Sequence, residues 1–383
     1  MPTTTGKNFL YRLALPFLAP GCGKDPVHLV SGHPLNYRND FLKLIRKHHV
    51  QGSSTILSSG NRQVLVLTHS ALSGHHAEKH TWYRVASITK MATALTCMRL
   101  CDQGILNLDA PVSGFLEGGH HCPELAGITL RHLLSHTSGL VDPPDLEQSL
   151  LDRKPYDTVL KNARVSMPGK RFCYSNLGFG LIGCILESVT GLSVDRVFRE
   201  YCFNPLSIDA TLNGMELDDT CIMPVTRILP FRNQELRITE LGKKNLSGPD
   251  PACHFGYTAG SMYITAQSLF RLMVFFRDGD PAFLNNSFRH EMMTDHSYYG
   301  ALSPTLSYGL GILIIRDSVL SSGRIIGHQG FAYGCADGAF FDETTGNIMI
   351  TLNGGCSEAR QGRLGQMNRD MIHYAFRKEL PSW

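Results

Sequence analysis

Two residues one helical turn apart, Ser87 and Lys90, carry the side chains of a nucleophile and a base. They open the apolar run from Ser87 to Leu95, and positions three apart on a helix share one face. Apolar neighbours would lower the pKa of Lys90, which would let it take the proton of the serine hydroxyl. Taken alone, the pair is better explained as an ordinary helix N-cap and a solvated lysine, because both residue types are common. The prediction therefore depends on the rest of the chain.

Hydrophobic spacing predicts the elements that position this pair. Before it lie a helix over 36–49 and two strands over 53–59 and 63–69; the pair itself begins a helix that runs to about 103. The chain ends with strands over 309–315, 324–327, 336–341 and 348–352, then a helix over 364–380. We expect an α/β (α+β) fold in which early and late strands form one antiparallel sheet flanked by the terminal helices.

The middle of the chain is predicted to be mostly helical, with helices over 130–135, 177–190, 194–203 and 265–277. Residues 1–35 are expected to be an N-terminal extension and 36–383 a single catalytic domain. In that domain the sheet comes from about 36–86 and 305–383, and 87–304 is a helical insertion. The irregular stretch 213–254 is the expected source of substrate selectivity, because long loops in compact domains often bind ligands.

Composition excludes several classes of partner. A net charge of +3 and a sequence pI of about 8.3 do not predict nucleic-acid binding, and no apolar run is long enough for a membrane span. The 11 cysteines are scattered, which favours reduced core thiols and a cytoplasmic location. The alternative is an exported lipoprotein anchored at Cys22. No metal site or cofactor is predicted, and the oligomeric state stays open.

Two further motifs stand in order behind Ser87-Ile88-Thr89-Lys90: Tyr174-Ser175-Asn176 opens a helix, and His328-Gln329-Gly330 ends a strand. The three together resemble the serine β-lactamase and penicillin-binding-protein superfamily. The resemblance is to the branch of class C β-lactamases, D-aminopeptidases, D-Ala-D-Ala carboxypeptidases of the His-Thr-Gly type and related esterases. It extends over the stretches 105–112, 128–140, 259–266 and 308–311.

The resemblance implies a role for each motif residue. Ser87 would be the nucleophile that forms an acyl-enzyme, with Lys90 and Tyr174 as a coupled acid–base pair. Asn176 would fix Lys90 and bind a substrate carbonyl. On the strand side, the residues expected to bind substrate or its oxyanion are His328, Gln329, Gly330 and Phe331, with the backbone N–H groups of Ser87 and Phe331 as the oxyanion hole. Within the stretch 128–140, His132 and His136 are expected to be structural.

The third motif departs from the Lys-Thr-Gly usual in β-lactamases of this branch. Gln329 replaces a small hydroxyl with a longer amide, which we expect to project into the cleft. Phe331 makes that side more aromatic. Both changes argue against efficient β-lactam hydrolysis and strict D-Ala-D-Ala carboxypeptidase action.

We therefore expect a serine hydrolase acting on an ester or amide in a small molecule or short peptide, with esterase or acyltransferase action favoured. The alternatives are a D-amino-acid peptidase, carboxypeptidase or weak β-lactamase, and an inactive scaffold or binding protein that keeps the fold. A metal-dependent hydrolase is a further alternative.

Overall fold

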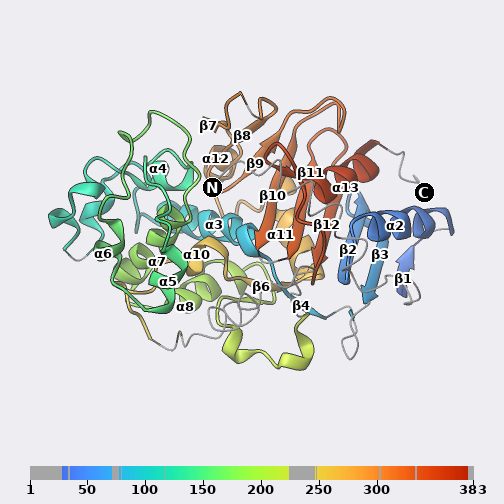
Figure 1. The fold of residues 1–383 in the computed structure, drawn as a ribbon, viewed down its shortest axis with the longest axis horizontal. Coiled ribbons are helices and arrows are strands. Elements are labelled where there is room, and N and C mark those ends of the chain that lie inside the picture. The colour runs from blue at the N-terminus through green and yellow to red at the C-terminus, as the bar shows by residue number, and fades with distance from the viewer. Residues whose placement is uncertain are drawn as a thin grey trace.

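The computed structural model describes residues 28–377, except 33–34, 71–76, 79, 117, 224–245, 247, 302 and 333. Its centre is a nine-stranded antiparallel sheet (Figure 1). In spatial order the strands are β1 (His28–Gly32), β3 (Arg62–Ser70), β2 (Gly52–Ser59), β12 (Ile348–Asn353), β11 (Cys335–Asp342), β10 (Ile325–Ala332), β9 (Leu313–Ile315), β8 (Leu306–Tyr308) and β7 (Ser297–Tyr298).

The early and late strands meet where β12 pairs with β2, with Ile350 opposite Ile56. This confirms the predicted sheet assembled from the two ends of the chain. The sheet begins earlier than expected, because β1 lies within the segment that was predicted to precede the domain and pairs with β3. Its short sequence of mixed polarity gave no clear strand pattern.

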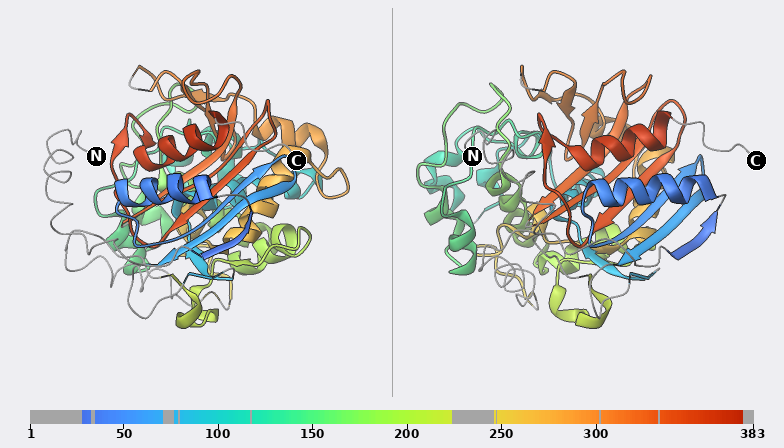
Figure 2. Two further views of the ribbon diagram at one scale, coloured as in Figure 1. Left: turned by 90° about the vertical axis from the view of Figure 1, so that its right-hand side faces the viewer. Right: turned by 45° about the vertical axis from the view of Figure 1, so that its right-hand side comes forward.

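Helices cover both faces of the sheet (Figure 2). The terminal helices α2 (Leu35–Lys47) and α13 (Gln366–Arg377) lie on one face, where His48 bonds to Asp370 at 2.7 Å. On the other face α11 (Ala266–Asp278) packs against β2, β11 and β12. The predicted packing of both terminal helices on the sheet is therefore confirmed.

The helical subdomain stands beside the sheet at the end of β10 (Figure 1). Its centre is α3 (Thr89–Asp102), which is buried on nearly every side, so its apolar residues surround the helix instead of forming one stripe. The other helices of the middle region are α4 (Leu130–Leu134), α5 (Leu146–Leu151), α6 (Tyr156–Leu160), α7 (Asn176–Thr190), α8 (Val194–Phe198), α10 (Tyr257–Gly260) and α12 (Asn286–Met292).

A second, three-stranded sheet was not predicted. It joins β4 (Trp82–Arg84), β6 (Tyr263–Thr265) and β5 (Ala210–Thr211), and its strands are too short to show a periodic pattern. It fixes the backbone that leads into Ser87, because Val85 N–H donates to Met262 O.

Several sequence predictions fall wholly or partly outside the described residues. These are the Cys22 segment and most of the expected selectivity loop, whose residues 224–245 lie there. Within the described ranges no single helix is long and apolar enough to cross a membrane; one bent pair, 176–190 with 194–203, passes by length and composition alone. The ten described cysteines are all free thiols.

Candidate active site

Ser87 lies in a single 3-10 turn, η1 (Ala86–Ile88), immediately before α3. The turn is held in an uncommon conformation, because Ala86 has a φ of +45° and its carbonyl accepts a hydrogen bond from Thr89 Oγ1 at 2.6 Å. Strand β10 passes close by: a Cβ added to Gly330 would lie 2.2 Å from Val85 O. Only glycine allows the strand to approach the nucleophile this closely.

Lys90 is completely buried and directed at Ser87. Its Nζ donates to Ser87 Oγ at 3.1 Å, Asn176 Oδ1 at 2.9 Å and Ala259 O at 2.6 Å. Burial lowers the pKa of Lys90 to about 7, with Arg84 adding to the decrease and Asp142 opposing it. Near neutral pH a substantial fraction of Lys90 is therefore the neutral amine. In that form two N–H groups can still face the amide and carbonyl oxygens while the lone pair faces Ser87.

Tyr174 also contacts the nucleophile. Its hydroxyl donates to Ser87 Oγ at 2.9 Å, and burial raises its pKa far above the usual value, although the bond to Ser87 opposes the rise. The phenol is therefore neutral and is a proton donor. The structure thus brings Ser87, Lys90 and Tyr174 together, as the sequence suggested.

Asn176 is oriented by a residue that the sequence did not reveal, Asp142. The Asp142 carboxylate accepts from Asn176 Nδ2 at 2.8 Å, Ser175 Oγ at 3.1 Å and Leu177 N at 2.9 Å. These bonds fix the amide of Asn176 so that its oxygen faces Lys90. The N-cap of α7 is Ser175, whose Oγ accepts from Gly178 N, and Asn176 is the first helical residue.

We call these four residues, Ser87, Lys90, Tyr174 and Asn176, the helical wall, and β10 from His328 to Ala332 the sheet wall. The pairing of β10 with β9 ends at Gly327, and β10 next contacts η1. The end of β10 therefore runs alongside η1, the turn that contains Ser87.

His328 was expected to bind substrate or its oxyanion, but its ring is buried and is hydrogen-bonded within the protein. It is 2% exposed, its Nε2 accepts from Tyr308 OH at 2.8 Å and its Nδ1 donates to Gln329 O at 2.6 Å. Burial lowers its pKa to about 3, so the ring is neutral.

The expectation for the Gln329 amide is also wrong. Gln329 Nε2 donates to Arg363 O at 2.7 Å, and Gln329 Oε1 accepts from Gly365 N at 2.9 Å. Both ends of the amide thus bind the backbone of the hairpin formed by β13 (Arg360–Gln361) and β14 (Leu364–Gly365). A longer side chain can reach a neighbouring backbone, and the sequence alone did not show that one lies there.

The hairpin brings a cation beside the sheet wall. The guanidinium carbon of Arg360 lies 4.2 Å from the centre of the Phe331 ring, and a Cβ on Gly365 would lie 2.1 Å from that ring. Arg360 acts electrostatically on Tyr174, and the Glu358 carboxylate acts in turn on Arg360. The sequence gave no signal for Arg360, because its position depends on the hairpin.

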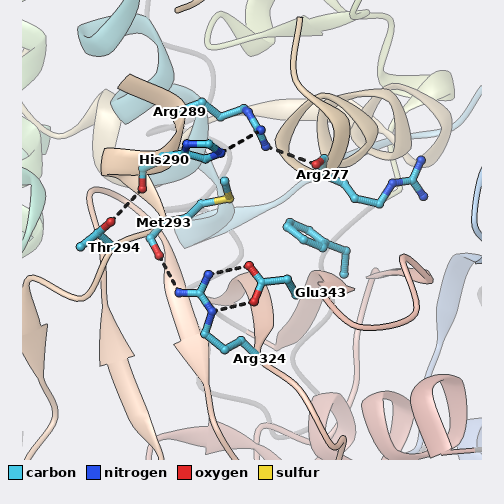
Figure 3. A pocket seen from close by; sticks show the side chains of 8 residues that line it. Arg277, Arg289, His290, Met293, Thr294, Arg324 and Glu343 are labelled. Atoms are coloured by element: carbon cyan, nitrogen blue, oxygen red, sulfur yellow. Dashed lines mark hydrogen bonds and ion pairs between the residues drawn. The ribbon is translucent and has the colours of Figure 1, made fainter. Parts of the chain in front are cut away.

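A separate pocket of about 280 Å³ opens near the opposite end of β10 (Figure 3). Its charges are largely paired: Arg324 binds Glu343 at 2.5 Å and Arg277 binds the neighbouring Asp278 at 2.7 Å. It contains none of the predicted site residues. Within the described ranges no group of three or more His, Cys, Asp or Glu side chains is arranged to hold a metal ion.

The chain is similar to several known proteins. The chain is 27% identical over 173 residues to the D-alanyl-D-alanine-carboxypeptidase/endopeptidase AmpH of Escherichia coli strain K12, covering 42% of this chain and 44% of that protein. It is 27% identical over 225 residues to penicillin-binding protein 4 of Amycolatopsis lactamdurans, covering 57% and 55%. The matched region thus spans about half the length of each of these relatives.

Solved structures share the fold. EstCE1, a hydrolase with promiscuous acyltransferase activity, superposes with a TM-score of 0.65 at 20% identity, over 96% of this chain and 99% of its own. The D-amino acid amidase of Ochrobactrum anthropi SV3 superposes with a TM-score of 0.64 at 22% identity, over 85% and 94%. The model of the Beta-lactamase family matches residues 38–353, which include all three motifs. The chain belongs to the Beta-lactamase family.

Proposed function

We propose that this protein is a serine hydrolase that forms an acyl-enzyme on Ser87, with an ester as the favoured substrate and transfer to an alcohol or amine as a possible second step. The observation that carries the proposal is the position of Ser87 Oγ, within hydrogen-bond distance of both Lys90 Nζ and Tyr174 OH. A nucleophile in contact with both a buried base and a neutral acid has what acyl transfer requires.

The first step uses the neutral form of Lys90. Ser87 Oγ attacks the substrate carbonyl, a C–O bond forms, and the serine proton passes to Lys90 Nζ. The backbone N–H groups of Ser87 and Phe331 are the proposed donors to the oxyanion. When the tetrahedral species collapses, the bond to the leaving group breaks, and that group takes a proton from the Lys90–Tyr174 pair.

Deacylation reverses the roles. Water, or another acceptor, gives its proton to the same pair and attacks the ester carbonyl. The Ser87–acyl bond breaks, and a proton returns to Ser87 Oγ. Each cycle leaves Lys90 and Tyr174 in their starting protonation states, so no cofactor is consumed.

Aromatic side chains near the site support an acyl group of modest polarity. Phe172, Tyr299 and Phe331 are each only half-buried, and Phe172 and Tyr299 have ring centres 4.2 Å apart. The fold-level likeness to EstCE1 over nearly the whole of both chains is in keeping with ester chemistry.

A second candidate, a peptidase or amidase for D-amino-acid substrates, is favoured by Arg360. Its guanidinium beside Phe331 could bind a substrate carboxylate, the group at the end of a peptide. The carboxypeptidase and amidase names among the related proteins agree with this alternative. An anionic substrate is therefore the feature that separates the second candidate from the first.

The test is intact-protein mass after incubation with a fluorophosphonate, a p-nitrophenyl ester and a penicillin. We expect an adduct on wild type that maps to Ser87 and is absent from Ser87→Ala. Ser138→Ala is a matched control, because Ser138 is buried and its Oγ accepts from Leu140 N within the same subdomain. If folded wild type is modified by none of the three reagents, the acyl-enzyme proposal fails and a scaffold role gains support.

A further inference from the structure

His136 lies directly behind Tyr174, and the mechanism above gives it no role. Its carbonyl accepts a hydrogen bond from Cys173 N at 2.7 Å, and its ring Nδ1 accepts one from Ser175 N at 3.1 Å. The peptide N–H groups on both sides of Tyr174 are therefore held by this one residue. Together the two hydrogen bonds fix the backbone from which the Tyr174 side chain projects.

The ring of His136 also supports the ring of Tyr174. The two ring centres are 4.1 Å apart with an angle of 33° between their planes. The imidazole is 1% exposed, and its other ring neighbours are Tyr308 at 4.7 Å, Phe179 at 4.8 Å and Phe172 at 5.7 Å. Tyr174 thus rests on a packed aromatic base whose position is set by His136.

This arrangement has two energetic penalties. His136 has a φ of +57°, a backbone conformation that costs on the order of 1–3 kcal/mol for a residue other than glycine. Because Nδ1 is an acceptor, the proton of the neutral ring is on Nε2, which is buried with no hydrogen-bond partner in the structure. A leucine or phenylalanine would fill the space without the unpaired N–H, so filling space does not explain a histidine here.

The neutral state of the ring is consistent with its role as an acceptor. Burial lowers the pKa of His136 well below its usual value, and the positive charge of protonated Lys90 acts in the same direction. The Nδ1 lone pair therefore stays available to Ser175 N–H throughout the neutral pH range.

We propose that His136 is a positioning residue that holds the hydroxyl of Tyr174 at hydrogen-bond distance from Ser87. The inference rests on the proposed function and deepens it, because it adds a residue that acts on the acid–base pair without touching the substrate. It also connects the third motif to the nucleophile: the His136 ring packs on Tyr308, whose hydroxyl bonds to His328.

The test compares two substitutions that separate the hydrogen bond to Ser175 N–H from the ring contact with Tyr174. His136→Asn keeps a side-chain oxygen near the place of Nδ1 and tolerates the left-handed backbone. His136→Phe keeps a stacked ring but leaves Ser175 N–H unpaired. We expect His136→Phe to slow single-turnover acylation by a p-nitrophenyl ester by about 10–100-fold with KM little changed, because small displacements of catalytic groups have effects of this size. His136→Asn should recover most of the rate.

His132→Asn is the matched control. His132 lies on α4, the helix that ends just before His136. It is half-buried and its Nδ1 accepts from Thr129 N at 3.2 Å, so its loss should lower stability without slowing acylation. If His136→Phe acylates at the wild-type rate, or if His132→Asn slows acylation as much, the positioning role is overturned. If wild type itself is not acylated at Ser87, the proposed function has failed and not only this inference.

A double-mutant cycle keeps the inference testable should His136→Phe not fold. If His136 acts through Tyr174, the rate loss of His136→Asn, about threefold, should vanish in a Tyr174→Phe background, because coupled residues are not additive. A loss that persists unchanged in that background would contradict the inference.

Discussion

The helical wall and the sheet wall use their polar side chains in opposite ways. On the helical wall, Lys90 and Tyr174 both donate to Ser87 Oγ, and Asn176 bonds to Lys90. On the sheet wall, His328 bonds to Tyr308 and its own strand, and Gln329 bonds to the β13–β14 hairpin. Motif residues near one nucleophile can thus serve chemistry on the helical wall and structure on the sheet wall.

This difference suggests a division of labour. The helical wall supplies the proposed acid–base chemistry, whereas the sheet wall supplies backbone groups and, through the hairpin, the Arg360 guanidinium. Substitutions on the helical wall should therefore act on every substrate, and those on the sheet wall should act on stability or on particular substrates.

The largest effect should come from Lys90→Met. The substitution removes the base from a buried position and keeps an apolar chain of similar length, so kcat should fall about 10³-fold, within the range for loss of a general base. Tyr174→Phe should lose about 10²-fold, because Lys90 can still take the serine proton. Steady-state hydrolysis of a p-nitrophenyl ester measures both. A greater loss for Tyr174→Phe would assign the base to Tyr174 and reverse the roles proposed above.

Asp142→Asn should reduce kcat less than Lys90→Met or Tyr174→Phe does, and it should shift the pH dependence of the reaction. The carboxylate of Asp142 raises the pKa of Lys90, so its removal lowers that pKa and increases the neutral fraction of the amine at a given pH. In wild type, kcat/KM should rise with pH up to about 7 and then level off. In the variant this rising part of the pH profile should move to lower pH. Its kcat should fall about tenfold, because Asn176 is less well oriented.

A pH–rate profile of both proteins is the measurement. Glu291→Gln, at a partly exposed ion pair with Arg131, is the control and should leave the pH at which kcat/KM rises unchanged. If kcat/KM of Asp142→Asn rises at the same pH as that of wild type, the rise does not report the titration of Lys90.

The contrast between the walls also explains what the sequence could predict. Ser87 and Lys90 are three residues apart, so their contact follows from helix geometry alone. The sheet followed from alternating apolar strands, and the motif resemblance pointed to Tyr174 and Asn176. Local spacing and the family pattern were therefore enough to predict most of the helical wall.

The contacts that the sequence did not reveal join segments far apart in the chain. Asp142 meets Asn176 across 34 residues, and Gln329 meets Gly365 across 36. Nothing in the local pattern around Gln329 distinguishes an amide that projects into a cleft from one that binds a hairpin. Which of the two occurs depends on tertiary packing.

Arg360→Gln should separate substrates by charge. Binding of a carboxylate by a guanidinium is worth about 1.5 kcal/mol or more, so kcat/KM for a half-ester such as mono-p-nitrophenyl glutarate should fall about tenfold. The rate with neutral p-nitrophenyl acetate should stay within about twofold of wild type, because no charge is recognised there. Arg196→Gln, at an exposed ion pair with Glu200, is the control. Equal losses for both esters would mean that Arg360 only supports Phe331 and would weaken the case for an anionic substrate.

The smallest effect on chemistry should come from Gln329→Met, which removes both hairpin bonds but keeps the length of the side chain. The buried Gly365 N–H loses its acceptor, so the free energy of unfolding should fall by about 1–3 kcal/mol. Turnover of a neutral ester should remain within about threefold of wild type, because the amide makes no contact with Ser87, Lys90 or Tyr174. Gln361→Met, exposed on the same hairpin, should change neither quantity. If Gln329→Met instead abolished acylation while the protein stayed folded, the sheet wall would have to be counted with the chemistry, and the division between the two walls would not hold.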